Sequence, residues 1–281
     1  MHTKKLHIEI TPKKDLFDIN IKEIFRYKDL LFLFVRRDFV ATYKQTILGP
    51  IWFLIQPILS SLVFYIVFNK FGKISTNGIP PFLFYMAGLT GWNYFSSCLT
   101  ATSNVFVGNA GIFGKVYFPR LITPLSIVIS NLIKFGIQLF LFLVFYSIYW
   151  AKGYDLNMSI YILFLPFLIF LMAGLGLGFG LTISALTTKY RDLTFLLAFS
   201  IQLLMYATPV IYPLSDIPEK YRFYIMLNPM SSVIETFKTI FFNNALINWY
   251  SLFYSLVFMV IMLFIGVVIF NKTERNFMDT V

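Results

Sequence analysis

Six long apolar runs separated by short polar segments dominate the hydropathy pattern of this chain. They cover residues 50–69, 82–107, 122–150, 160–186, 194–212 and 250–270. About 20 apolar residues, at about 1.5 Å of rise per residue, cross a hydrocarbon core of about 30 Å. The pattern therefore predicts an all-α integral membrane protein with six transmembrane helices in a single domain over residues 1–281.

A polar segment of different character precedes the first run. Residues 1–19 read as a tail, and residues 20–38 have the periodicity of an amphipathic helix. Such a helix lies in the headgroup plane of a membrane, and a soluble helix packed on a partner is the alternative. Because residues 1–29 lack the apolar core of a secretory signal, we expect the first run to act as its own signal anchor. The expected apolar face consists of Ile21, Ile24, Phe25, Leu31, Phe32 and Val35, and the opposite face of Lys22, Arg26, Asp29, Arg36 and Arg37.

Proline and glycine mark features within the runs. Gly49-Pro50 opens the first run, since proline suits a first helical turn, and Pro57 is expected to kink it. The fourth run carries two overlapping G-x-x-x-G spacings, at 174/178 and 176/180, which predict close approach of neighbouring helices.

Residues 213–249 form the largest outer segment and contain an apolar stretch that is too short to span a membrane. Ser232 and Glu235 form an S-x-x-E capping signal before this stretch, and Asn228-Pro229 predicts a helix break. These features favour an outer re-entrant or interfacial helix pair within the segment.

Positively charged side chains gather in the segments that six spans place on the cytoplasmic side. Residues 1–49 hold ten Lys and Arg residues, and the other predicted cytoplasmic segments hold six, against six in the outer segments. This positive-inside bias predicts cytoplasmic N- and C-termini. The formal net charge of +10 is thereby explained by orientation and by anionic lipid headgroups, and it does not indicate nucleic-acid binding.

Residues suited to metal or covalent chemistry are scarce. The one cysteine is Cys98, and the two histidines, His2 and His7, lie in the N-terminal tail. An intrachain disulfide, a thiolate zinc site and a histidine site within the membrane are therefore excluded.

The pair Gly114-Lys115 resembles the end of a phosphate-binding loop. That motif requires glycine where Asn109 stands and Ser or Thr where Val116 stands. The sequence therefore predicts no ATP bound through this motif, and it predicts no catalytic residue, metal site or cofactor in this chain.

Lys134 is the one charged residue well inside a predicted span. With Asn131 and Gln138 it forms a polar stripe at helical spacing on the third span. Intramembrane charge is costly and usually faces a bundle interior or a water-filled cavity, so Lys134 is a candidate lining residue of a polar pathway. A snorkelling lysine or an internal hydrogen-bond partner is the alternative. No predicted span contains an acidic residue, which argues against an ion-coupled secondary transporter.

Aromatic residues make up 20% of the chain, and most are expected to face lipid or the membrane interface. Those that lie in or near the spans are further candidates, because aromatic faces with polar tips suit a sliding sugar chain. These candidates are Tyr65, Trp92, Tyr94, Tyr206 and Tyr212. Just before the first span, Arg36, Arg37 and Lys44 are candidates for receiving the pyrophosphate of a lipid carrier, although pairing with anionic lipid or with Asp38 explains them equally well.

A series of short motifs, in chain order, resembles a known family. They are Arg37-Asp38-Phe39, Tyr43-Lys44-Gln45-Thr46-Ile47-Leu48-Gly49-Pro50-Ile51-Trp52, Gln56-Pro57, Gly88-Leu89 with Trp92, Asn109 with Lys115-Val116-Tyr117-Phe118-Pro119-Arg120, Pro124, Tyr190-Arg191-Asp192-Leu193, Thr208-Pro209-Val210-Ile211-Tyr212-Pro213 and Asn228-Pro229-Met230. On these residues, which cover most of 30–270, the chain resembles the membrane subunit of polysaccharide-exporting ABC transporters of the O-antigen, teichoic-acid and capsule type. It departs from the pattern after Asn109, where Ala110-Gly111-Ile112 stands in place of an expected leucine.

The resemblance implies a permease subunit and not an enzyme. In that family two permease copies work with two copies of a separate cytoplasmic ATPase, which holds ATP and Mg. They move a glycan on a polyprenyl pyrophosphate lipid outward across the bacterial cytoplasmic membrane. By position, the coupling helices correspond to 22–36, 109–119 and 188–193, and the outer re-entrant pair corresponds to 214–245. The residues expected to couple to the ATPase are Lys22, Arg26, Asn109, Lys115, Arg120, Tyr190, Arg191 and Asp192.

Two other functions are compatible with the sequence. One is an ABC export permease for drugs or small lipids, although the aromatic density and Lys134 argue against a purely apolar cargo. The other is a membrane-bound acyl- or glycosyltransferase, which needs a base or metal cluster near the membrane face. Asp38 and Asp192 are the inner-face candidates for such a base, and both stand beside arginines.

Overall fold

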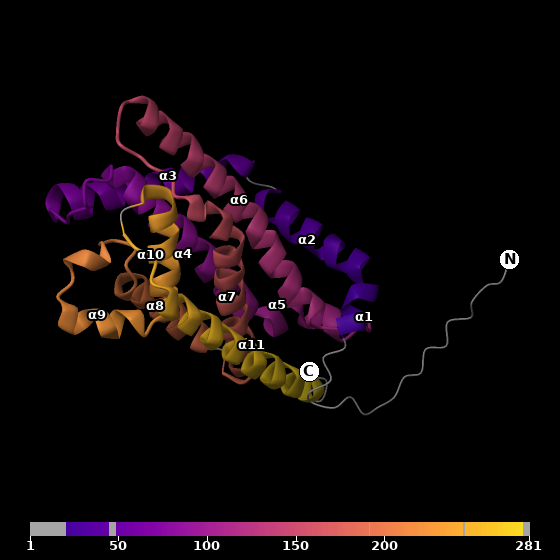
Figure 1. The fold of residues 1–281 in the computed structure, drawn as a ribbon. Coiled ribbons are helices and arrows are strands. Elements are labelled where there is room, and N and C mark those ends of the chain that lie inside the picture. The colour runs from indigo at the N-terminus through magenta and orange to yellow at the C-terminus, as the bar shows by residue number, and fades with distance from the viewer. Residues whose placement is uncertain (1–20, 45–48, 191, 244, 278–281) are drawn as a thin grey trace.

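The computed structural model describes residues 21–44, 49–190, 192–243 and 245–277, and the regular structure of these residues is helical (Figure 1). The α-helices are α1 (Ile21–Arg26), α2 (Lys28–Tyr43), α3 (Trp52–Phe64), α4 (Pro81–Ser103), α5 (Val105–Phe113), α6 (Ile122–Ala151), α7 (Leu165–Lys189), α8 (Leu193–Ala207), α9 (Glu219–Met226), α10 (Pro229–Phe242) and α11 (Trp249–Phe277). Short helical turns extend them at η1 (Gly49–Ile51), η2 (Tyr65–Phe71, π-helical), η3 (Ile160–Phe164) and η4 (Leu214–Asp216).

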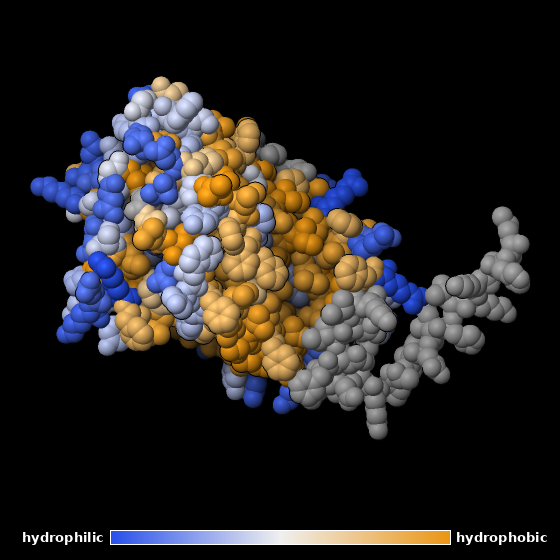
Figure 2. All heavy atoms as spheres, in the orientation of Figure 1, coloured by the Kyte–Doolittle hydropathy of each residue, from blue (hydrophilic) through white to orange (hydrophobic). Residues whose placement is uncertain are grey.

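Four of the described helical segments are long and apolar enough to cross a membrane. They are Trp52–Phe71, Ile122–Ala151, Ile160–Lys189 and Trp249–Glu274. On the face shown in Figure 2, hydrophobic residues form a broad band between hydrophilic ends, as a bilayer requires. The helical membrane class is confirmed. The six-span count stays a prediction, because its two remaining spans correspond to the largely buried α4 and to α8, which has 15 residues.

Two predicted spans extend beyond the helices that form them. The run 82–107 is divided at Asn104, where α4 ends and α5 begins, so the expected loop helix at 109–119 lies instead at Val105–Phe113. The run 194–212 contains α8 only as far as Ala207. Thr208 precedes Pro209, and the proline ring forces the preceding residue out of the helical region into the extended conformation that Thr208 adopts.

The alternating glycines of α7 let two helices approach it from different sides. A Cβ atom added at Gly178 would lie 2.9 Å from the backbone nitrogen of Leu263 on α11, and one at Gly176 would lie 3.0 Å from the carbonyl oxygen of Phe95 on α4. Each G-x-x-x-G spacing thus serves one neighbour, 174/178 for α11 and 176/180 for α4. The predicted close packing is confirmed, and it is made with two helices at once.

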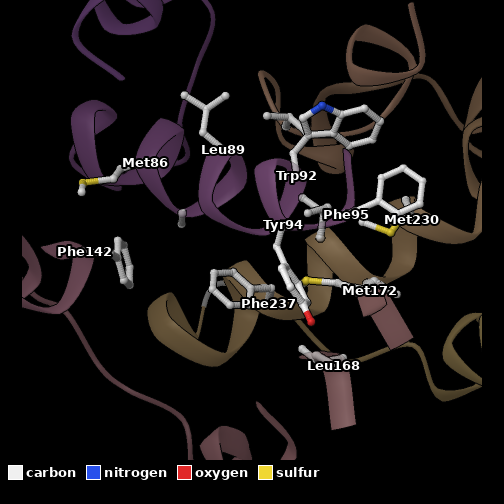
Figure 3. Close-up of a cluster of buried hydrophobic side chains, with 14 of the residues drawn as sticks. Met86, Leu89, Trp92, Tyr94, Phe95, Phe142, Leu168, Met172, Met230 and Phe237 are labelled. Carbon is white, nitrogen blue, oxygen red and sulfur yellow. The ribbon is translucent and has the colours of Figure 1, made fainter. Parts of the chain in front are cut away.

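Helix α10 fills the space between α4, α7 and α11. All but one of its side chains are buried, and Phe237 belongs to the same core cluster as Met172 (Figure 3). The predicted break at Asn228-Pro229 is confirmed, with Asn228 as the N-cap of α10. The expected capping role of Ser232 is wrong. Ser232 lies inside the helix, and its hydroxyl meets that of Ser255 on α11 at 2.6 Å.

The N-terminal helices run beside α6 (Figure 1). The predicted helix 20–38 is divided at Tyr27 into α1 and α2, and α2 continues to Tyr43. Its buried side chains are Phe34 and Val35, whereas Phe25 and Phe32 are 72% and 63% exposed. The predicted apolar face therefore coincides only in part with the face that packs on the protein. Ile24, Leu31 and Val35 are buried or partly buried, whereas Phe25 and Phe32 are exposed, because side chains that face lipid and side chains that face protein are equally apolar.

Helices α3 and α8 bury few of their side chains. The buried residues of α3 are Pro57 and Ser61, and that of α8 is Leu197. Gly49 has a φ of +50°, a left-handed conformation that favours glycine, at the entry to α3. The α-helix continues through Pro57 and changes to π-helical geometry only at Tyr65, so the expected kink at Pro57 stays a prediction.

Candidate functional site

A polar stripe on α4 forms the floor of a groove in the otherwise apolar bundle. The stripe is made of residues spaced three, four and seven apart, which places them on one side of the helix. They are Asn93, Ser96, Ser97, Thr100 and Asn104.

The predicted stripe on α6 faces this floor. Asn131 and Lys134 line two adjoining cavities, of about 340 Å³ and 530 Å³, which also share Ser96 and Ser97. Gln138 lines the first of them. The two cavities thus form one polar groove between α4 and α6, and this groove is the candidate site.

Helices α3 and α8 flank the groove at its two cavities. Phe53 and Gln56 of α3 line the first, and Ala198 and Ile201 of α8 line the second. Both flanking helices bury few side chains, so the groove is bounded by helices that make little contact with the core.

Lys134 is the cation of the groove and is half-buried. Asp38 on α2 and Cys98 on α4 lie close enough to interact with it electrostatically. Among the described residues that line the groove, none is acidic. Lys134 therefore leaves the groove wall positive, with its nearest carboxylate on a helix outside that wall.

The lining of the groove suits a hydroxylated, anionic cargo. Amide and hydroxyl side chains both donate and accept hydrogen bonds, and an ammonium group binds phosphate or carboxylate. Among the described residues, no group of three or more His, Cys, Asp or Glu side chains could hold a metal ion. The polar lining itself supports binding or passage of a cargo.

The aromatic residues predicted to line the pathway do not share one cavity. Tyr94 lines the groove and lies 5.0 Å from the ring of Phe135, whereas Trp92 lines a different cavity. Figure 3 shows the two side chains leaving α4 in opposite directions. Tyr65, Tyr206 and Tyr212 line neither cavity.

The cavity that Trp92 lines is separate from the polar groove. It is apolar and lies between α4, α7 and α8. Its volume is about 460 Å³, and its walls include Trp92, Phe95, Phe179 and Leu204. Ile201 of α8 lines both this cavity and the polar groove. Helix α4 therefore presents a polar face to one cavity and an apolar face to the other, and α8 borders both.

The predicted ATPase-coupling residues fall into two structural groups. Arg26, Lys115, Tyr190 and Asp192 are exposed on α1 and on the turns that follow α5 and α7. Their side chains are available to a partner. The side chain of Lys22 and the whole of Arg191 lie outside the described residues.

Arg120 and Asn109 are engaged within the chain. Arg120 Nη1 donates to the carbonyl oxygen of Glu274 at 2.8 Å, and its Nε lies 3.7 Å from the Glu274 carboxylate. Burial lowers the pKa of Arg120, and the charge of Glu274 partly raises it again. Asn109 accepts a hydrogen bond of 3.4 Å from Arg37. These contacts join the α5–α6 turn to α11 and α5 to α2.

The proposed lipid-entry residues are not equivalent. Arg37 is held by Asp38 at 2.8 Å and stacks over the ring of Phe34 at 4.5 Å. Arg36 and Lys44 are exposed. Of the three, Arg37 has the clearest structural role. It pairs with Asp38, which is the alternative to pyrophosphate binding that the sequence left open.

Residues 208–210 form a connector between α8 and the segment that follows it. The hydrogen bonds that hold this connector were not predicted from the sequence. Lys238, counted as a basic residue of the outer segment, is 1% exposed. Its Nζ donates to the carbonyl oxygens of Pro209 and Val210, the latter at 3.2 Å, and lies 3.7 Å from the centroid of the Phe84 ring. Asn228 adds a bond of 2.8 Å to the Thr208 hydroxyl. The connector is thus tied to α10.

Comparison with known proteins gives consistent results. The model of the ABC-2 type transporter family matches residues 29–242. An O-antigen export system permease protein RfbA from Klebsiella pneumoniae is 29% identical over 253 residues, which cover 89% of this chain and 94% of that protein. Its namesake from Myxococcus xanthus is 27% identical over 93% of this chain and 98% of its own length. The polysialic acid transport protein KpsM of Escherichia coli is 24% identical, over 85% and 91%.

Proposed function

The chain belongs to the ABC-2 type transporter family, and from this premise we propose that it is the permease half of an ATP-driven polysaccharide exporter. The cargo is a polyprenyl-pyrophosphate-linked, O-antigen-like glycan that moves from the cytoplasm outward. The relatives that carry O-antigen and polysialic acid names match this chain over most of both lengths, which supports a glycan as the cargo.

The polar groove between α4 and α6 is the observation that carries this proposal. Its amides and hydroxyls suit sugar rings, and Lys134 suits the phosphate or acidic groups of the cargo. A drug or simple lipid would bind poorly to this lining. An apolar cargo leaves the polar side chains of the groove without hydrogen-bond partners, which costs free energy.

Two copies of the chain complete the passage in this proposal. One chain supplies a groove whose flanking helices, α3 and α8, bury three residues between them. A second copy set against these helices encloses the groove and covers their exposed apolar faces. The homodimer binds two copies of a cytoplasmic ATPase, which hold ATP and Mg, and this chain binds no cofactor of its own.

The coupling surface is the exposed part of α1 and the turns after α5 and α7. Arg26, Lys115, Tyr190 and Asp192 project from it. In this arrangement the protein crosses the bacterial cytoplasmic membrane six times, with both termini in the cytoplasm and α9–α10 as the outer re-entrant pair. Closure of the ATPase moves the inner end of α8 through the turn at Tyr190.

Reconstitution tests the proposal directly. The permease and its ATPase are placed in inside-out vesicles with polyprenyl-pyrophosphate-linked glycan, and protected lumenal glycan is measured. We expect accumulation that requires ATP, both proteins and the lipid carrier. Accumulation without the ATPase, or turnover of nucleotide or covalent substrate by this chain alone, would contradict the proposal.

A further inference from the structure

The apolar cavity beside α8 has the lining of a site for a hydrocarbon chain. Of its fifteen lining residues, Ser200 and Asn228 are the polar ones, and the rest are aliphatic, aromatic, proline or methionine side chains. Its volume of about 460 Å³ lies in the range of about 300–1,000 Å³ that holds small ligands. It therefore has room for a segment of a long chain.

The position of this cavity relative to the polar groove is informative. Ile201 lines both spaces, and Lys134 lines the same part of the groove as Ile201. A polar space with a cation and an apolar space thus meet at one side chain of α8. This arrangement matches a single amphiphile whose anionic group and hydrocarbon chain diverge at the junction.

Helix α8 is suited to admitting such a molecule. It forms one wall of the cavity through Leu193, Leu196, Leu197, Ser200, Ile201 and Leu204. Leu197 is its one buried residue, whereas its outer end is followed by the connector that Lys238 and Asn228 fasten to α10. Outward displacement of α8 therefore disrupts little packing and leaves its outer end attached.

We propose that the apolar cavity holds part of the polyprenyl chain of the lipid carrier, while Lys134 binds the carrier's phosphate in the adjoining groove. This inference rests on the proposed function, because it takes the glycan carrier as the ligand. The groove favours that lipid over a phospholipid. The group attached beyond the phosphate must fit among Asn93, Ser96, Thr100 and Asn131, and these donors and acceptors suit a sugar.

Photolabelling of the complex tests the site. The permease with its ATPase, in nanodiscs, is exposed to decaprenyl phosphate that carries a diazirine in its chain, and labelled peptides are identified by mass spectrometry. We expect labels on α4, α7 and α8 at cavity residues such as Leu99, Ile183 and Leu204. Excess unlabelled decaprenyl phosphate should displace the label, and an equal excess of phosphatidylglycerol should not.

Variants at lining and exposed leucines provide a matched control. Leu204 lines the cavity, whereas Leu163 in η3 is 81% exposed and lines neither space. We expect Leu204→Trp, or Ser200→Phe, to reduce labelling by about tenfold, since the added ring excludes several methylene groups of the ligand. Leu163→Trp should label like the wild type.

A second probe separates the chain from the phosphate. Decaprenol with the same diazirine but no phosphate should label the cavity equally in the wild type and in Lys134→Met. Labelling by the phosphate probe should fall in Lys134→Met. A phosphate probe that is indifferent to residue 134 would overturn the assigned phosphate position.

The other outcomes are also decisive. Labels confined to residues outside the cavity, or displaced equally by phosphatidylglycerol, would show an ordinary lipid contact and overturn the inference. Glycan export by a wild-type complex that fails to label the cavity would refute this inference alone. Specific labelling by a complex that exports no glycan would refute the proposed function and leave the lipid site standing.

Discussion

The tightly packed core of α4, α7, α10 and α11 differs from the two helices, α3 and α8, that flank the polar groove. In the core, glycine backbones touch and α10 is buried over almost its whole length. The flanking helices bury three residues between them. The difference indicates a division of labour, in which a rigid frame carries the polar floor while the groove's borders are free to move or to pair with another copy.

The largest effect is expected from a substitution that pushes the core helices α7 and α11 apart. A side chain at Gly178 would meet the backbone of α11 at 2.9 Å, and neither backbone can yield cheaply. We expect Gly178→Leu to destabilise the protein by about 3 kcal/mol, as overpacking does. The measurement is the yield of monodisperse protein in detergent, together with its thermal midpoint.

Gly136 on α6 is the matched control, because a Cβ added there meets nothing within 4 Å. Gly136→Leu should leave yield and midpoint unchanged. Equal yields and thermal midpoints for Gly178→Leu and Gly136→Leu would show that the core is not packed more tightly than the rest of the bundle.

The next effect concerns the connector that ties α8 to the core. Lys238→Met keeps the length of the side chain and removes its bonds to the carbonyl oxygens of Pro209 and Val210. We expect a loss of about 2 kcal/mol of stability, the worth of a hydrogen bond to a charged group. Thermal unfolding in detergent measures it.

Lys220→Met serves as the control for that loss, since Lys220 is exposed on α9. An unchanged midpoint for Lys238→Met would mean that the buried lysine contributes no net stability. In that case the end of α8 at Ala207 would be as loosely held as the rest of the helix.

In the groove, the same type of substitution should act on transport and spare stability. Lys134 is half-buried beside a cavity, so Lys134→Met should leave the thermal midpoint near that of the wild type. We expect glycan export to fall by about tenfold, which corresponds to one lost charge-assisted bond to the cargo. Surface glycan in a complemented deletion strain reports the change, with exposed Lys152→Met as the control; full export by Lys134→Met would remove this lysine from the pathway.

The weakest effect is expected at the turn after α5, which the proposed function places in the cytoplasm. Lys115 is exposed, so Lys115→Glu should reduce affinity for the ATPase by about threefold, in line with the modest worth of surface charges. Co-purification at graded salt measures it, and Lys220→Glu on the outer segment should have no effect. Arg120→Gln should instead lower thermal stability, because Arg120 joins its turn to Glu274.

The sequence predicted the long helices well and their surroundings less well. The runs 122–150 and 160–186 agree with Ile122–Ala151 and with η3–α7, because uninterrupted apolar residues define a helix without reference to its neighbours. The face by which α2 contacts α6 was not predictable in this way. Phe32 and Phe34 are equally apolar, and only the fold decides that one is exposed and the other buried.

The site was half visible in the sequence. Asn131, Lys134 and Gln138 were recognised by their spacing, and the matching stripe from Asn93 to Asn104 has the same helical signal but no charge to draw attention to it. Lys238 was overlooked. From the sequence it counted only as a basic residue of the outer segment, and its partners are backbone carbonyl groups that no side-chain pattern encodes.

The enclosure of α10 bears on how the protein is made. Helix α10 packs between α4, α7 and α11, and α11 leaves the ribosome after α10. With Glu235 and Lys238 in its sequence, α10 is a poor substrate for insertion into lipid by itself. The docking of α10 is therefore completed only after translation has delivered α11.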